Sequence, residues 1–161
     1  MMNKFNLLFI TFFKIGKIKF APGTLASFIT CLLFLLFVNL FNIVILLFFT
    51  LLIALYSFIA INNSFDSFDS NDPQEIVIDE VVGQMLPLLA VPIYETLYLA
   101  PKEYYCIAAF ILFRLFDIWK PFPINYIDIN TEGTLGIMLD DILAGIYTII
   151  ILIIIFFFIG G

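Results

Sequence analysis

The sequence predicts an all-α, polytopic membrane protein with about four to five membrane-embedded helices and an active site on the cytoplasmic face. The 161-residue chain is 63% hydrophobic, and its mean hydropathy is +1.14. A soluble domain is nearer half apolar, with about a quarter of its residues charged. Helices of about 20 residues with short connections use nearly the whole length, so we expect residues 1–161 to form a single membrane domain.

Charge and cysteine content exclude several classes of protein. The net charge is −6, and the seven basic residues are spread along the chain, whereas nucleic-acid binding needs clustered Lys and Arg. Cys31 and Cys106 lie inside apolar runs, where a lone cysteine behaves as a small hydrophobe. We therefore expect no nucleic-acid partner, disulfide or reactive thiol, and the sequence does not indicate an oligomeric state.

The N-terminal half predicts a retained leader followed by two crossings. Residues 1–17 resemble a signal peptide, but no small-residue cleavage site precedes Lys14, so we interpret the segment as retained. The apolar stretch Leu25–Ile61 would be about 55 Å long as one helix, far beyond a hydrocarbon core of roughly 30 Å. Two crossings that turn near Asn39 and Asn42 fit better.

Three further apolar stretches predict one crossing each, and basic residues predict their orientation. These stretches are Val81–Ala100, Tyr104–Trp119 and Ile142–Ile159. Lysines concentrated before the first crossing place the N-terminus in the cytoplasm. Counting crossings then puts residues 62–78 and 120–140 on the cytoplasmic face and residues 101–103 on the other. The lysines that precede the first crossing are Lys4, Lys14, Lys17 and Lys19.

The segment DPQEIVIDEVVG contains the first acidic pair. Asp72 is a good N-cap, Pro73 suits the first helical position, and Glu75 completes a capping box, so the pattern predicts a helix that starts at Asp72. Asp79 and Glu80 follow where the chain enters the membrane edge. Since an ionised carboxylate without partners is unfavourable there, a functional role is favoured for this pair.

The segment FRLFDIWKP places three charged residues along one side of a helix. Arg114, Asp117 and Lys120 are spaced i, i+3 and i+6, and Pro121 ends the helix. One interpretation is an internal salt-bridge ladder in which Lys120 extends to the membrane surface. The other is a functional site, because Arg114 lies about two turns inside an apolar run and needs a buried partner.

The segment GTLGIMLDDILAG contains the second acidic pair. Gly133 and Gly136 indicate a tight entry into the last helix, and Gly145 permits another helix to come close. Asp140 and Asp141 could act as N-cap residues of that helix, although capping accounts for one aspartate better than for two.

We expect all these polar residues to converge on one cytoplasmic interface. Like charges so close need a counter-ion, and a chain with no His and no paired cysteines does not favour zinc or copper. An all-oxygen cluster suits Mg²⁺ together with substrate phosphate. Lys120 and Arg114 supply cations for that phosphate, and Thr24, in the APGT turn, lies where an anion can be received. The expected metal ligands are Asp79, Glu80, Asp117, Asp140 and Asp141.

The residues absent from the sequence limit the chemistry. Without His, a histidine-dependent phosphatase is excluded, and the chain has neither a Cys-x₅-Arg loop nor an Asp-x-Asp-x-Thr nucleophile. Metal-assisted hydrolysis by water is therefore the favoured reaction. A covalent aspartyl phosphate remains open, as does the division of the carboxylates into metal ligands and general base.

At these residues the sequence resembles the phosphatidylglycerophosphatase A family. The resemblance covers about Gly16 to Gly145, and four motifs carry it in the family's order and spacing: APGTLAS, DPQEIVIDEVVG, FRLFDIWKPFPI and GTLGIMLDDILAG. Lys14 and Lys19 interrupt the family's Gly-rich run, and Ala26 stands where Gly is usual. The resemblance implies a bacterial inner-membrane enzyme that hydrolyses phosphatidylglycerophosphate with Mg²⁺. By position it implies roles for Thr24, Asp72, Asp79, Glu80, Arg114, Asp117, Lys120, Asp140 and Asp141.

Three alternatives belong to other functional classes. A small cation transporter or channel would also use membrane carboxylates, but it predicts them near mid-helix, where only Glu95 approaches. A lipid head-group phosphotransferase would use the same metal and interface, yet no nucleotide-handling Asp-Gly motif is present. A non-catalytic scaffold would explain the apolar content but not the charged residues.

Overall fold

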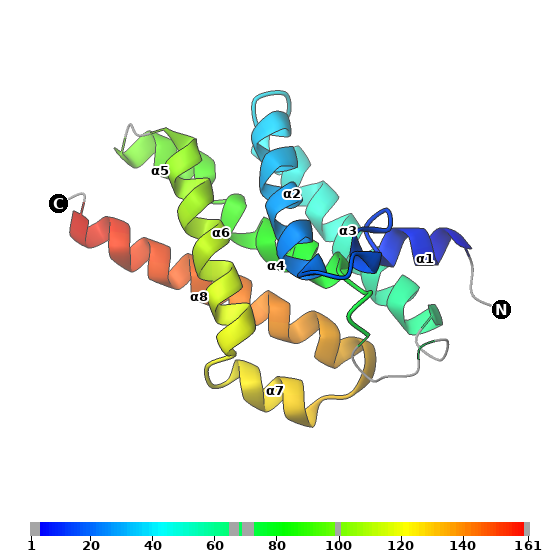
Figure 1. Ribbon diagram of the computed structural model, residues 1–161. Helices are drawn as coiled ribbons and strands as arrows, with labels where there is room; N and C mark the ends of the chain where they lie inside the picture. The colour runs from blue at the N-terminus through cyan, green and yellow to red at the C-terminus, as the bar shows by residue number, and fades with distance from the viewer. Residues whose placement is uncertain (1–3, 65–67, 69–72, 99–100, 160–161) are drawn as a thin grey trace.

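The computed structural model describes residues 4–64, 68, 73–98 and 101–159, and every regular element in these ranges is helical (Figure 1). The prediction of an all-α fold is therefore confirmed. The elements are α1 (Lys4–Ile10), the 3₁₀ turn η1 (Ile15–Lys17), α2 (Pro22–Phe37), α3 (Ile43–Ser64), α4 (Ile78–Leu88), α5 (Val91–Tyr98), α6 (Lys102–Trp119), α7 (Ile124–Asn130) and α8 (Gly133–Ile159).

Helices α2 and α3 form the predicted hairpin. The chain turns between Phe37 and Ile43, as the asparagines in this segment indicated. At the turn the Val44 N–H donates a hydrogen bond to Asn42 Oδ1 at 2.9 Å, which satisfies one of the free amides at the start of α3. Pro22 opens α2, where its missing N–H costs no helical hydrogen bond.

Helix α4 lies at the centre of the molecule, packed against α2, α3, α6 and α8. Its 11 residues extend about 16 Å, too short to cross a bilayer. The predicted single helix over Val81–Ala100 is wrong: α4 ends at Leu88 and α5 begins at Val91. Pro87 and Pro92 explain the break, because proline removes a backbone donor and clashes with the preceding turn of a helix.

Two described helices are long and apolar enough to cross a membrane, judged by length and composition: α3 over Ile43–Ser64 and α8 over Gly133–Phe158. Helix α2 is shorter, with 16 residues, and α6 carries four charged side chains. Large apolar side chains on α2, α3 and α8 are exposed, including Leu36, Leu55 and Ile153. A membrane protein is thus favoured, while four to five full crossings stay a prediction.

The predicted helix start at Asp72 is also wrong. The described residues of this segment, Pro73 to Val77, are not helical, and Val77 is the N-cap of α4. The Val77 N–H donates to the Ile10 carbonyl oxygen at 3.0 Å, so the end of α1 holds the segment in place of local capping. Asp72 itself lies outside the described residues.

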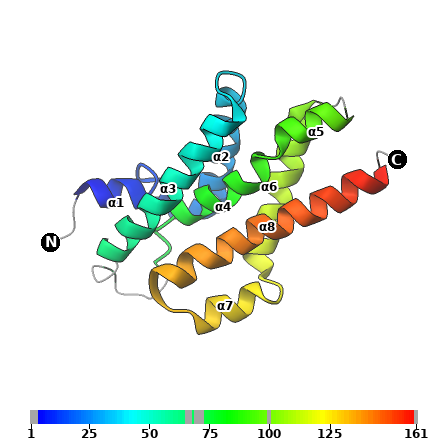
Figure 2. The ribbon, with the colours of Figure 1, turned by 180° about the vertical axis from the view of Figure 1, so that it is seen from behind.

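Helix α8 begins at Gly133, about two turns before the second acidic pair. An N-cap role for Asp140 and Asp141 is therefore wrong. Figure 2 shows α8 passing α4 and α6 and continuing to the opposite end of the molecule. Glycine permits a backbone contact at the crossing with α4. A Cβ atom on Gly145 would lie 2.5 Å from the Gly83 carbonyl oxygen, and one on Gly83 would lie 2.7 Å from the Asp141 carbonyl oxygen. The predicted close approach at Gly145 is confirmed.

We expect Gly145→Val to destabilise the protein by about 1–3 kcal/mol or more, because the added carbons meet the backbone of α4 and cannot be relieved by a rotamer change. The thermal midpoint of the detergent-purified protein measures the effect. Ile153→Phe also enlarges a side chain, but on the exposed face of α8, and should leave the midpoint nearly unchanged. Equal midpoints for the two variants would show that the crossing is looser than described.

Candidate active site

One pocket of about 400 Å³ collects the sequence-predicted residues. Its walls are the first turns of α2 and α4, the last turn of α6, and α8 two turns after its start. Four segments far apart in the sequence therefore contribute to a single site. All the predicted residues except Asp72, which lies outside the described residues, line it: Thr24, Asp79, Glu80, Arg114, Asp117, Lys120, Asp140 and Asp141.

Three carboxylates form the centre of this pocket. Asp79, Glu80 and Asp141 each offer one oxygen, and these oxygens lie within 4.8 Å of one another. Asp79 is 8% exposed and Asp141 only 3%. Among the described residues, no hydrogen-bond donor reaches Asp79 Oδ1, Glu80 Oε2 or Asp141 Oδ1. Buried oxygens without donors fit a hard cation, and an all-carboxylate set suits Mg²⁺ better than zinc.

The electrostatics of the first acidic pair support this interpretation. Burial, together with the neighbouring carboxylates, raises the pKa of Asp79 well above its usual range. Burial also raises the pKa of Glu80 from 4.5 to about 7; Asp117 adds to this increase, whereas Arg114 opposes it. Without a cation, these groups therefore favour binding protons. A divalent ion would replace the protons and remove the repulsion.

Glycine at position 23 brings the acidic pair against the start of α2. A Cβ atom there would lie 2.0 Å from Glu80 Oε1, so a larger side chain cannot occupy this position without moving the carboxylate. Thr24, the next residue, also lines the pocket. The free amides of the first turn of α2 therefore border the carboxylates, in an arrangement that can receive a phosphate group.

Arg114 and Asp117 form an ion pair one turn apart on α6, and both side chains are 14% exposed. This contact gives Arg114 an acidic partner that is mostly shielded from solvent. Lys120 does not extend the ladder to the surface. It ends α6 in the left-handed conformation, with φ 45°, and this geometry turns its side chain away from the line of the helix.

Lys120 instead connects the two following helices. Its Nζ lies 2.5 Å from Asp128 Oδ1 on α7 and 2.7 Å from Asp140 Oδ2 on α8. Burial lowers the pKa of Lys120, but the hydrogen bonds to both carboxylates outweigh burial and raise it, so the side chain stays charged. Among the described residues, the five predicted metal-binding carboxylates thus divide into three that each have an oxygen without a donor and two, Asp117 and Asp140, that are paired with cations.

Sequence reasoning missed three residues near the site. Lys19 and Gln74 line the pocket, and Asp128 holds Lys120. Gln74 lies inside an acidic motif already identified, and Lys19 lies two residues before the Ala-Pro-Gly turn, so proximity to those motifs was a usable signal. The contact of Asp128 depends on how α7 folds back after Pro121, which no local pattern indicates.

Residues 8–156 match the family model described as phosphatidylglycerophosphatase A. The chain belongs to this family. It is 37% identical over 151 residues to the phosphatidylglycerophosphatase A of Haemophilus influenzae, covering 94% of this chain and 88% of the relative. A Bacteroides thetaiotaomicron protein, provisionally named a phosphatidylinositol-3-phosphatase, is 39% identical over 145 residues, which cover 88% of this chain and 87% of that protein.

The phosphatidylglycerophosphatase A of Escherichia coli is 41% identical over 76 residues, which cover 47% of this chain and 40% of that protein. No solved structure matches the chain. The family model and the relatives named for this activity identify the protein as a phosphatase. In this member of the phosphatidylglycerophosphatase A family, the residues that match the family model, 8–156, include all four segments that form the walls of the pocket.

The metal-free protein should lose stability as the pH rises from 4.5 to about 7. The pKa of Glu80 is raised in the folded state, so folding retains a proton over this interval that the unfolded chain releases. Thermal midpoints in chelator across this pH range measure the loss. We expect Glu80→Gln to reduce the slope, and Mg²⁺ to raise the wild-type midpoint most at pH 7.

Glu103→Gln, on the exposed first turn of α6, is the matched control and should keep the wild-type slope. The same slope for Glu80→Gln and wild type would contradict the assignment of this proton to Glu80. If Mg²⁺ raises the thermal midpoint of Asp141→Asn as much as that of wild type, Asp141 is not a metal ligand.

Proposed function

We propose that the protein is a Mg²⁺-dependent phosphatase that hydrolyses phosphatidylglycerophosphate to phosphatidylglycerol and phosphate. The observation that carries the proposal is a group of three carboxylates, each with one buried oxygen that no donor among the described residues reaches, placed beside two cationic side chains and a helix N-terminus in one pocket. The carboxylates can bind a cation, and the cationic side chains with the helix N-terminus can bind a phosphate beside it. The proposed substrate follows the name of the family and of the Haemophilus influenzae relative.

Asp79, Glu80 and Asp141 would hold Mg²⁺, and Asp117 and Asp140 complete the acidic set. When bound, the ion supplies a Lewis acid for the phosphoryl oxygens and lowers the pKa of a water molecule. The carboxylates would hold the ion through oxygens that no protein donor occupies. They also provide the acceptor for the proton that leaves the attacking water.

The cationic residues of the pocket would stabilise the phosphoryl group. Lys120 remains protonated through its contacts with Asp128 and Asp140, so its charge is available beside the ion. Arg114 lies at the same wall, and Thr24 lies with the amides of the α2 start. Together they would bind the negative charge that accumulates in the transition state.

The same cations disfavour the principal alternative. A cation channel or transporter needs a path that attracts positive charge along its length, whereas Lys120 and Arg114 line this pocket together with its carboxylates. An anionic substrate would pair with the cationic side chains, and a bound metal ion would pair with the carboxylates. The name of the Bacteroides relative favours a second head group, the phosphoinositides, within the same reaction class.

We place the protein in the bacterial inner membrane as a multi-pass protein, with the pocket on the cytoplasmic face. The support is the N-terminal concentration of lysines and the position of Lys19 on the pocket wall, which puts the pocket beside the basic segment.

The purified protein should release phosphate from phosphatidylglycerophosphate only when Mg²⁺ or a similar hard cation is present. We expect Asp79→Asn and Asp141→Asn to lower kcat by about a hundredfold or more, because each removes charge from the metal site while keeping the side-chain shape. A phosphate-release assay with phosphatidic acid and a phosphoinositide as competing substrates measures both activity and head-group choice.

Glu75→Gln is the matched control. Glu75 is exposed, and its Lys17 partner lies 3.9 Å away outside the pocket, so turnover should change less than about twofold. Full activity in excess chelator would overturn the metal mechanism. Faster hydrolysis of the phosphoinositide than of phosphatidylglycerophosphate would show that a phosphoinositide is the preferred substrate.

A separate prediction concerns the orientation of the chain. A cysteine at Asn130, on the exposed end of α7, should react with a membrane-impermeant thiol reagent only from the cytoplasmic side, and one at Glu103 only from the other side. Labelling in intact cells and in inverted vesicles distinguishes the two sides. Reaction of both cysteines from one side would contradict the proposed crossings of α6.

A further inference from the structure

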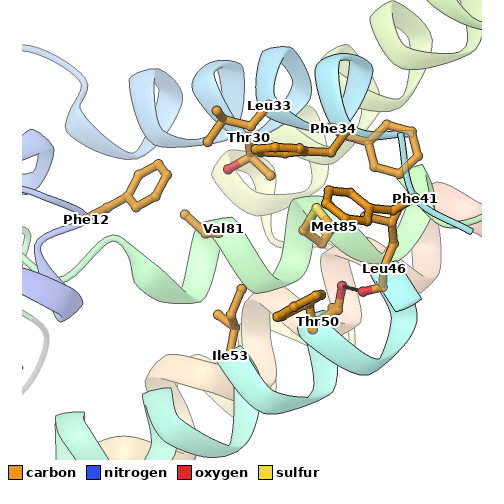
Figure 3. Close-up of a pocket in the computed structure, with 12 residues that line it drawn as sticks. Phe12, Thr30, Leu33, Phe34, Phe41, Leu46, Thr50, Ile53, Val81 and Met85 are labelled. Carbon is orange, nitrogen blue, oxygen red and sulfur yellow. Dashed lines mark hydrogen bonds between the residues drawn. The ribbon is translucent and has the colours of Figure 1, made fainter. Parts of the chain in front are cut away.

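A second pocket, of about 380 Å³, lies between α2, α3 and α4 (Figure 3). It contains none of the residues of the acidic site. Thr30, Leu33 and Phe34 of α2 form one wall, and Leu46, Thr50 and Ile53 of α3 form the opposite wall. Val81 and Met85 of α4 lie between the two walls, and Phe12 lies at one end.

Among the described residues, the side chains of the lining offer no free hydrogen-bond donor. Its only two polar side chains are already used within their own helices: Thr30 Oγ1 donates to the Ala26 carbonyl at 2.8 Å, and Thr50 Oγ1 donates to the Leu46 carbonyl at 2.8 Å. An occupant with unsatisfied donors or acceptors would lose its hydrogen bonds here. The pocket therefore fits a wholly hydrocarbon group, and its volume lies within the range of about 300–1,000 Å³ typical of ligand pockets.

The pocket is elongated in the direction of the α2–α3 hairpin. Figure 3 shows Phe12 and Val81 at one end, Met85 in the middle, and Phe41 and Leu46 at the end near the hairpin turn. Along α3 the lining residues run from Leu46 to Ile53, a rise of about 10 Å. A linear chain lying along the hairpin matches this shape, whereas a compact ligand does not.

The pocket begins beside the acidic site and opens toward the outside. Val81 directly follows Glu80 on α4, so neighbouring residues of one helix face the two pockets. Helix α2 also lines both, with its first turn in the acidic site and its later turns here. Leu33 and Phe37 are each 38% exposed and Phe49 is 51% exposed, so the outer side of the pocket merges with the apolar surface of the hairpin.

We propose that this pocket binds an acyl chain of the substrate lipid while its phosphate occupies the acidic site. This inference rests on the proposed function, because it assigns the apolar end of the same substrate. The head group would lie at Asp79 and Glu80, and the chain would continue past Val81 toward the hairpin turn. Phe12 borders the pocket at one end, where its backbone has the left-handed conformation, with φ 41°, that is uncommon for a bulky residue.

Filling the pocket tests the inference. Leu33→Trp enlarges the α2 wall, and Met85→Phe enlarges the α4 wall. For phosphatidylglycerophosphate with long acyl chains, we expect each variant to lower kcat/KM about tenfold, because a displaced chain moves the phosphate from its reactive position. For the dihexanoyl form, whose chains are too short to fill the pocket, kcat/KM should stay within about twofold of wild type.

Leu36→Trp is the matched control, since Leu36 lies on the same helix, is 59% exposed and does not line the pocket. It should behave as wild type with both substrates. Native mass spectrometry of the detergent-purified protein provides a readout that does not depend on catalysis. We expect wild type and Leu36→Trp to retain one long-chain substrate lipid when it is added with chelator, and the two filled variants to lose it.

The outcomes separate this inference from the proposed function. If wild type hydrolyses neither chain length, the proposed function fails. If wild type hydrolyses both and the filled variants match Leu36→Trp in kinetics and lipid retention, the proposed function stands and the acyl site is overturned. Equal losses on both chain lengths would also overturn it, because the pocket would then serve the fold alone.

Discussion

The backbone contact between α4 and α8 determines where the acidic side chains of this protein lie. Gly83 and Gly145 let the two helices approach until carbonyl oxygens fill the space that side chains would otherwise occupy. This approach brings Asp141 to the first turn of α4, where Asp79 and Glu80 are already adjacent in sequence. Burying three carboxyl groups together opposes such packing, and the apolar contacts along α4 must offset this cost until a cation is bound.

Much of the site could be predicted because its parts are local. The acidic pairs, the Arg114–Asp117 spacing and the Pro-Gly-Thr turn each lie in a short motif, and one pocket contains all of them. The division of residues 25–61 into a hairpin was equally predictable, because helix rise and bilayer thickness leave few alternatives. In these cases the sequence pattern and the tertiary structure favour the same arrangement.

The errors arise where tertiary contacts override local preferences. A capping box favoured a helix from Asp72, but Val77 bonds to Ile10 and delays the start of α4 to Ile78. One of the two interpretations of Lys120 took it to the membrane surface, yet its left-handed backbone directs it to Asp128 and Asp140. Neither contact follows from sequence spacing, because both depend on segments that meet only after the chain has folded back.

The short, central α4 also constrains how the protein is assembled. Helices α3 and α8 are apolar enough to enter a bilayer independently, whereas α4 has 11 residues, two of them carboxylates in its first turn. On the proposed topology it would leave water only against partners that are already inserted, in the second stage of a two-stage assembly. Asp141 lies on α8, which follows α4, α5, α6 and α7 in the chain. The three-carboxylate centre therefore cannot form until α8 has been synthesised and has packed against α4.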